Sequence, residues 1–243
     1  MRILIISDIH GNLAALEAVL EAANEQGYGR VWCLGDVVGY GPDPNDCVTE
    51  VRNLEALCIA GNHDWAALGK IPLEDFNSDA ERASLWTRDQ LAPESVSYLE
   101  KQPQIRGEGN FALAHGSPRH PIWEYIHLPS VAAANFAYFD TPYCLVGHSH
   151  IPVIFRALDE HKAEMFFPPP DVPLVLGEER LIINPGSVGQ PRDGDPRASY
   201  VLLDEEAGTL QFHRVEYPIG RTQTRIMEAG LPPRLAARLA FGW

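Results

Sequence analysis

Short apolar runs that alternate with helix-like segments place the strongest constraint on the fold of this chain. The runs MRILIISD (residues 1–8), RVWCLGD (30–36) and EALCIAGNHD (55–64) are each typical of a buried strand. Residues 13–27 repeat leucine and alanine at helical spacing, and PNDCVTEVRNL (44–54) has the composition of a second helix. Strands that are apolar throughout and separated by helices predict a largely parallel sheet buried on both faces.

The remaining residues divide into a helical stretch and a β-rich stretch. Residues 64–102 predict a helical insertion. NFALAHGSP (110–118) and PYCLVGHSH (142–150) then return to the strand pattern, with a helix expected between them at 129–139. Residues 152–217 predict a second, more antiparallel sheet packed on the first. The expected fold class is therefore α/β with two sheets.

The charge of the chain limits its partners. Its 33 acidic and 19 basic residues give a formal net charge of −14, which repels nucleic-acid backbones and anionic lipid headgroups. We therefore expect neither non-specific nucleic-acid binding nor membrane binding. A small phosphorylated ligand can still bind where metal ions supply local positive charge.

The cysteines and the N-terminus indicate a reducing compartment. The cysteines form no CxxC pair and predict buried thiols: Cys33, Cys47, Cys58 and Cys144. The N-terminal residues enter a strand without a signal-peptide pattern, and nowhere do 18 apolar residues follow one another. These features predict a cytoplasmic location.

A histidine, an aspartate or both follow each of five apolar runs, in the segments DIHGN, GD, GNHD, HG and GHSH. The carboxyl ends of strands in α/β sheets form the crevice where ligands bind, so these side chains are expected to converge. The potential metal ligands are Asp8, His10, Asp36, Asn62, His115, His148 and His150.

These ligand types suit two metal ions better than one. Nitrogen and oxygen donors without thiolate suit manganese, iron, zinc, nickel or cobalt better than calcium or magnesium, and they do not select one of these metals. The cofactors that we expect are two divalent transition metals, with manganese first. Two such ions can share a carboxylate and hold a bridging hydroxide for in-line attack at phosphorus.

The series DIHGN, GDVVGYGPDP, GNHD, HGSP and GHSH resembles the calcineurin-like metallophosphoesterase superfamily. INPGSVGQPRDGDPRASY is similar to its small bacterial and archaeal phosphodiesterase branch. The resemblance extends from residue 3 to about 217 and implies a single domain over residues 1–243, a four-layer α/β/β/α sandwich of two mixed β-sheets flanked by helices. The apolar pattern near the chain end adds one short helix at about 224–241.

The resemblance also implies a role for each site residue. One metal would be bound by Asp8, His10 and His150, and the other by Asn62, His115 and His148. Asp36 would bridge the two ions. His63 would protonate the leaving oxygen as general acid, and Asp64 would support catalysis by orienting its neighbours.

The expected function is therefore a dinuclear metal-dependent phosphodiesterase, in which a metal-bridging hydroxide attacks a small phosphate-ester substrate. The second motif reads GDVVGYG and lacks the arginine of the GDxVDRG motif in serine/threonine phosphatases and symmetrical dinucleotide hydrolases. Alternatives are a phosphomonoesterase, a nucleotide pyrophosphatase on the same core, or a non-catalytic binding scaffold.

Substrate choice is expected to depend on loops at 119–129 and 160–180. Trp123 and Tyr125 in the first loop either stack on a base or cover the sheet. Residues that can contact the substrate are Asn12, Arg119 and Arg192.

Overall fold

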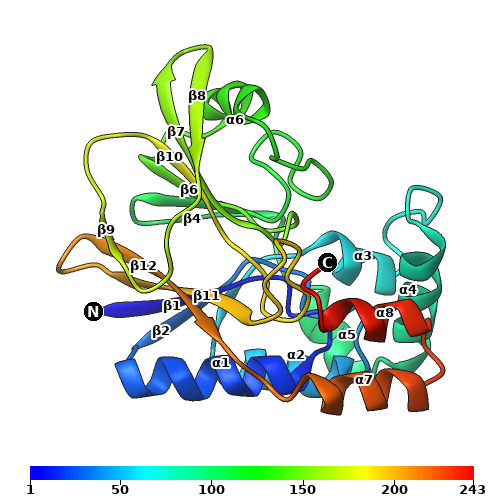
Figure 1. The fold of residues 1–243 in the computed structure, drawn as a ribbon. Helices are drawn as coiled ribbons and strands as arrows, with labels where there is room; N and C mark the ends of the chain where they lie inside the picture. The colour runs from blue at the N-terminus through cyan, green and yellow to red at the C-terminus, as the bar shows by residue number, and fades with distance from the viewer.

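Two six-stranded β-sheets pack together, with helices on their outer faces, in the computed structural model, which describes residues 1–243 (Figure 1). In spatial order the first sheet contains β3 (Leu57–Cys58), β2 (Arg30–Cys33), β1 (Arg2–Ile6), β11 (Ala198–Asp204), β12 (Thr209–Val215) and β9 (Pro173–Val175). The second contains β4 (Ile105–Glu108), β5 (Phe111–Ala114), β6 (Tyr143–Leu145), β10 (Leu181–Pro185), β7 (Pro152–Asp159) and β8 (Lys162–Phe166). The expected four-layer sandwich of two mixed sheets is confirmed.

The division of strands between the sheets differs from the expectation. β1, β2 and β3 are parallel neighbours as expected, but β5 and β6 lie in the second sheet, where β6 also pairs in parallel with β10. The β11–β12 hairpin lies in the first sheet, where β11 pairs antiparallel with β1. Sequence patterns do not separate these arrangements, because the central strands of both sheets are buried on both faces.

Alternate residues of β1 face different parts of the core. Ile3 and Ile5 belong to the apolar cluster between the sheets, whereas Leu4 and Ile6 belong to the cluster beneath the outer helices. This twofold periodicity fixes the register of the strand. The strand therefore leaves the core at a defined point, from which Asp8 follows two residues later.

Helices cover both outer faces of the sandwich (Figure 1). α1 (Leu13–Gln26) and α2 (Pro44–Asn53) pack on the first sheet, and α6 (Pro129–Asn135) with the 3-10 turn Phe136–Tyr138 packs on the second. Between β3 and β4 lie α3 (Asn62–Ala67), α4 (Ser78–Gln90) and α5 (Pro93–Leu99). No helix is both long and apolar enough to cross a membrane. All four cysteines are free and buried, as expected.

The chain ends in two helices, α7 (Ile219–Glu228) and α8 (Pro233–Leu239), rather than in one helix at about 224–241. Gly230 has a φ of +69°, which ends the first helix. Pro233 cannot continue a helix but fits a first helical turn, so a new helix begins there. Both helices pack with α4 around Tyr40.

Candidate metal centre

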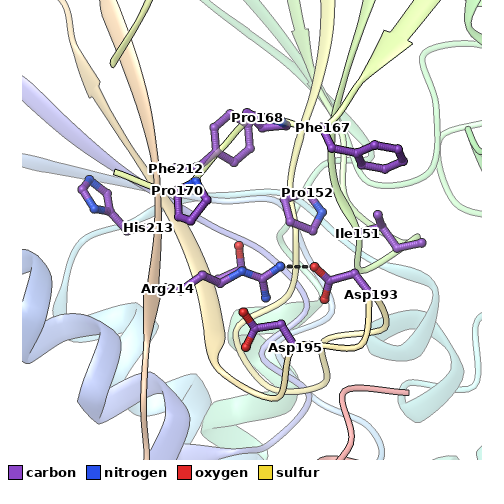
Figure 2. A pocket seen from close by; sticks show the side chains of 11 residues that line it. Ile151, Pro152, Phe167, Pro168, Pro170, Asp193, Asp195, Phe212, His213 and Arg214 are labelled. Atoms are coloured by element: carbon purple, nitrogen blue, oxygen red, sulfur yellow. Dashed lines mark hydrogen bonds and ion pairs between the residues drawn. The ribbon is translucent and has the colours of Figure 1, made fainter. Parts of the chain in front are cut away.

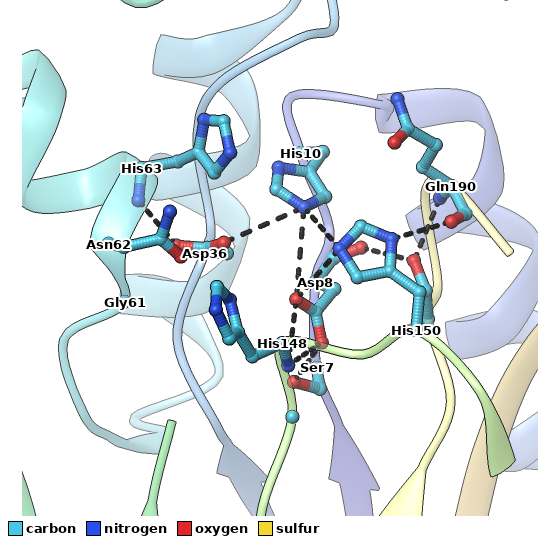
Figure 3. A network of polar contacts seen from close by, with 12 residues as sticks. Ser7, Asp8, His10, Asp36, Gly61, Asn62, His63, His148, His150 and Gln190 are labelled. Atoms are coloured by element: carbon cyan, nitrogen blue, oxygen red, sulfur yellow. Dashed lines mark hydrogen bonds and ion pairs between the residues drawn. The ribbon is translucent and has the colours of Figure 1, made fainter. Parts of the chain in front are cut away.

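The polar residues at the strand ends converge on one site, although their strands belong to two sheets (Figure 3). Asp8 follows β1 and Asp36 follows β2 in the first sheet, whereas His115 and His148 follow β5 and β6 in the second. The structure brings together all seven residues singled out in the sequence, and each is only 0–2% exposed.

Five of these seven residues have left-handed backbone conformations. The φ angles lie between 51° and 66° for Asp8, His10, Asp36, His148 and His150. Non-glycine residues rarely adopt this region, and each instance costs about 1–3 kcal/mol. The surrounding structure must therefore hold these turns, as is common where side chains are aimed into a functional site.

Two glycines leave room for the site carboxylates. A Cβ on Gly61 would lie 2.0 Å from Oδ1 of Asp36, and one on Gly147 would lie 2.8 Å from Oδ2 of Asp8. Both distances are shorter than van der Waals contact. The glycines of GNHD and GHSH are thus required by the close approach of backbone to ligand side chains.

Asp8, His10 and His150 form the first group of potential ligands. The two Nε2 atoms lie 3.1 Å apart, and Nε2 of His150 lies 3.2 Å from Oδ1 of Asp8. Each Nδ1 donates to a backbone carbonyl, from His10 to Val38 at 3.2 Å and from His150 to Gln190 at 2.6 Å. In a neutral ring this leaves Nε2 with a lone pair that points into the site.

The charges in this group favour a cation. Burial lowers the pKa of both His10 and His150, which makes their rings neutral at pH 7. Burial raises the pKa of Asp8, but the neighbouring His150 outweighs this effect and holds the pKa at about 2. One carboxylate and two imidazole lone pairs therefore face one another, which is a donor set for a divalent transition metal.

Asn62, His115 and His148 form a second group, next to Asp36. Nε2 of His115 lies 3.1 Å from Oδ1 of Asn62 and 3.2 Å from Oδ2 of Asp36. Nδ1 of His115 donates to a backbone carbonyl, and Nε2 of His148 donates to the carbonyl of Trp123 at 3.2 Å, which leaves Nδ1 of His148 free for a metal.

Asp36 lies between the two groups. Its Oδ2 atom is also 3.6 Å from Nε2 of His10, is buried and accepts no hydrogen bond. Burial lowers the pKa of His115, but the Asp36 carboxylate outweighs it and raises the pKa to about 10. Asp36 therefore requires a positive charge beside it, which a proton on His115 or a bound cation can supply. The residues present fit two divalent cations with Asp36 between them.

His63 lies over the same site. Its backbone N–H donates to Oδ1 of Asp36 at 2.8 Å, and its ring centroid is 4.9 Å from that of His10. The Nδ1 atom is buried without a hydrogen-bond partner. Burial lowers the pKa of His63 to about 4, against the opposing charge of Asp36.

Asp64 holds the backbone of the site rather than the ring of His63. Its carboxylate accepts N–H bonds from Asp36 at 2.9 Å, Gly61 at 3.0 Å and Val38 at 3.1 Å. Burial and the charge of Asp36 raise its pKa to about 7, against the pull of the N–H donors. Asp64 thus ties the loop after β2 to the start of α3.

Two residues that were expected to contact the substrate form hydrogen bonds within the protein. The amide of Asn12 caps α1 through Ala15 and donates to the Gly189 carbonyl at 2.9 Å and the Tyr217 hydroxyl at 3.3 Å, which uses both of its N–H donors. Arg119 donates through Nε and Nη2 to Glu124. Asn12 therefore supports the loop before α1, and Arg119 forms an ion pair within its own loop.

Arg192 lies beside the site. Its guanidinium carbon is 5.8 Å from the ring centroid of Tyr40, and Nη2 donates to Oε1 of Gln190 at 2.8 Å. The Tyr40 ring is 4.7 Å from that of His10 and 4.3 Å from that of His63. Arg192 is therefore a cation next to the imidazoles.

Three further residues lie next to the site, and of these only Tyr125 was singled out in the sequence. Tyr40 has a φ of 59°, and the flanking glycines of GYG are the signal for its tight turn. Tyr125 stacks on His148 with ring centroids 3.7 Å apart. Gln190 orients His150 through its backbone carbonyl, so its residue type gives no signal.

A cavity of about 520 Å³ lies next to the residues that follow His150 and Arg192 (Figure 2). Its charged side chains are paired: Arg214 with Asp193, and Asp195 with Arg197 outside the lining. Phe167, Pro168 and Phe212 supply apolar surface. This cavity therefore has no unpaired cation to bind a phosphate.

Comparison with known proteins gives a consistent match. A family model described as a calcineurin-like phosphoesterase superfamily domain matches residues 1–208. The crystal structure of a metallophosphoesterase from Sphaerobacter thermophilus is 50% identical, with a TM-score of 0.91, and the match covers 100% of this chain and 99% of that one.

Two relatives match along most of their length. The uncharacterized protein MJ0912 of Methanocaldococcus jannaschii is 40% identical over 248 residues, 99% of this chain and 98% of that protein. Phosphodiesterase YfcE of Escherichia coli K12 is 28% identical over 211 residues, 85% of this chain and 89% of that protein.

Proposed function

Because the chain belongs to the calcineurin-like phosphoesterase superfamily, and so to the metal-dependent phosphoric ester hydrolases, we propose that it hydrolyses phosphodiesters with two divalent cations. The similarity to phosphodiesterase YfcE over 85% of the chain supports a diester substrate. The observation that most supports the metal centre is Oδ2 of Asp36, a buried carboxylate oxygen without a hydrogen bond between two groups of imidazoles.

The two cations would be held by the two groups of residues. Asp8, His10 and His150 would hold one, Asn62, His115 and His148 the other, and Asp36 would contact both. When bound, such cations supply Lewis acidity toward phosphoryl oxygens and activate water. These nitrogen and oxygen donors suit manganese, iron, zinc, nickel or cobalt, and manganese is the metal that we propose to test first.

His63 would deliver the proton to the departing alkoxide. Its imidazole is buried beside Asp36, and its Nδ1 atom has no partner that competes for the proton. Burial lowers its pKa to about 4, and an anionic phosphate beside the ring would raise it by stabilising the imidazolium.

Arg192 would hold a non-bridging phosphate oxygen. It lies beside the imidazole cluster, above the Tyr40 ring, and its guanidinium donates to a neutral side-chain amide and forms no ion pair. A guanidinium there provides charge-assisted hydrogen bonds to phosphate. It would take the role of the arginine that is missing from the GDVVGYG motif.

The test is hydrolysis of bis-p-nitrophenyl phosphate beside p-nitrophenyl phosphate by chelated protein re-supplied with manganese. We expect the diester to be cleaved faster, and only with metal. His63→Ala should lose about 100-fold on a diester with an alkyl leaving group, and less on bis-p-nitrophenyl phosphate, whose leaving group departs without a proton. His161→Ala, at an exposed histidine, is the matched control. Metal-independent turnover, or faster cleavage of the monoester, would contradict the proposal.

A further inference from the structure

A second cavity, of about 320 Å³, lies between α3 and the loop after β5. Trp65 on α3, two residues after His63, forms one wall, and Trp123 in the loop after β5 forms another. The remaining lining residues are Ile71, Gln104, His120, Pro121 and Ile122.

Two aromatic side chains lie between this cavity and the ring of His63. The ring centroids of His63 and Phe76 are 5.1 Å apart, and those of Phe76 and Trp123 are also 5.1 Å apart. The backbone carbonyl of Trp123 accepts the hydrogen bond from His148. Trp123 therefore accepts a hydrogen bond from a proposed metal ligand through its backbone carbonyl, and it also lines the cavity.

The lining has the chemistry of a site for a flat neutral ring. None of its seven residues is an acid, a lysine or an arginine, and two are indoles. The side chains of Gln104 and His120 are exposed and make no hydrogen bond. Indole faces stack on aromatic rings, and a free amide and imidazole can bond to the polar edge of a heterocycle.

The loop that carries Trp123 is held in place before any ligand binds. The carboxylate of Glu124 accepts hydrogen bonds from Ser117 at 2.7 Å, Asn135 at 2.8 Å and Arg119. These bonds link the loop to the end of β5 and to α6. A loop that is already fixed in this way loses little conformational entropy when a ligand binds.

We propose that this cavity binds the departing organic arm of the diester, and that this arm carries a heteroaromatic ring, as a nucleoside does. The inference rests on the proposed function and narrows its substrate class. Phe76 contacts both His63 and Trp123, so the cavity wall at Trp123 is one ring away from the residue that would give its proton to the departing arm. In the reaction, water adds its hydroxyl group to phosphorus, the bond from phosphorus to the nucleoside oxygen breaks, and the proton goes to that oxygen.

The first test is inhibition of bis-p-nitrophenyl phosphate hydrolysis by adenosine in the manganese-loaded enzyme. We expect competitive inhibition by adenosine and none by ribose, which lacks the ring. Trp123→Ala should raise the inhibition constant about tenfold or more, and Trp123→Phe should restore most of the affinity. Tyr138→Ala, at an exposed aromatic residue on the 3-10 turn, should leave it unchanged. Diester hydrolysis without adenosine inhibition would overturn the inference and leave the proposed function intact.

The second test is product analysis with adenosine 5′-methyl phosphate. Binding of the nucleoside beside His63 predicts adenosine and methyl phosphate as products. Formation of adenosine 5′-monophosphate and methanol would place the nucleoside on the opposite side of phosphorus, and would overturn the assignment of the cavity. This outcome is independent of any variant and so does not depend on whether Trp123→Ala folds.

Discussion

The Nε2 atoms of His10 and His150 lie 3.1 Å apart in the buried site, and both rings donate through Nδ1 to backbone carbonyls. Two imidazole lone pairs at this distance repel each other unless a positive charge lies beside them. This arrangement therefore favours the metal-bound protein over the metal-free protein.

Manganese is accordingly expected to stabilise the fold. At a free metal concentration of 100 times the dissociation constant, the gain is about 2.7 kcal/mol. Thermal unfolding of chelated protein, with and without manganese, measures this shift. His150→Ala should reduce the shift, and His161→Ala should retain it. An unchanged melting temperature in the wild type would contradict the expectation.

Gly61→Ala should disrupt the site through Asp36. The new Cβ would lie 2.0 Å from Oδ1 and 2.4 Å from the backbone nitrogen of Asp36, so the loop after β2 must move. Overpacking of this kind costs about 1–3 kcal/mol. Urea unfolding and manganese affinity would both report it. Gly107→Ala, where no atom lies within 4 Å of the new Cβ, is the control, and equal effects of the two variants would contradict the argument.

Asp64→Asn should weaken catalysis, although residue 64 would not contact the substrate. The carboxylate accepts three backbone N–H bonds around Asp36, and an amide in its place turns an NH₂ group toward one or more of these donors. Loss of such support for a metal ligand costs about 10–100-fold in metal affinity or activity. Manganese titration and diester kinetics would measure the loss. Asp89→Asn, an exposed position on α4, should show none.

The Glu124 network should make stability depend on pH. Burial raises the pKa of Glu124, but hydrogen bonds from Arg119, Asn135 and Ser117 outweigh it and lower the pKa from 4.5 to about 2. Because the folded pKa is depressed, the stabilisation is complete above the unfolded pKa and is lost as the pH falls toward 2.

The difference in free energy of unfolding between wild type and Glu124→Gln should therefore be constant from pH 7 to about pH 5.5 and shrink below it. Urea titrations at pH 7, 5 and 3 measure it. A difference that stays constant or grows as the pH falls would show that the ionised carboxylate does not stabilise the loop.

The site residues could be predicted from the sequence, whereas the arrangement of the strands around them could not. The residues at the strand ends were predictable because apolar runs end at a shared edge of an α/β fold, and all seven converge as expected. The assignment of β5 and β6 to the second sheet was not predictable, because strands buried on both faces have no distinguishing pattern.

The hydrogen-bond partners of individual side chains could not be predicted from the sequence either. Asn12 and Arg119 have the chemistry of phosphate contacts, yet Gly189 and Tyr217 accept both N–H donors of Asn12, and Glu124 pairs with Arg119 through Nε and Nη2. These partnerships depend on residues that are distant along the chain or on loop geometry. The division of the chain end into α7 and α8, in contrast, follows from Gly230 and Pro233, which the sequence does contain.

The number of metal ions bound per chain tests the dinuclear centre most directly. Elemental analysis of manganese after dialysis of the reloaded protein should give two ions per chain for the wild type and for Asp89→Asn. Asp36→Asn removes the carboxylate between the two groups of ligands and should bind one ion or none. One ion or none in the wild type would contradict a centre built on Asp36.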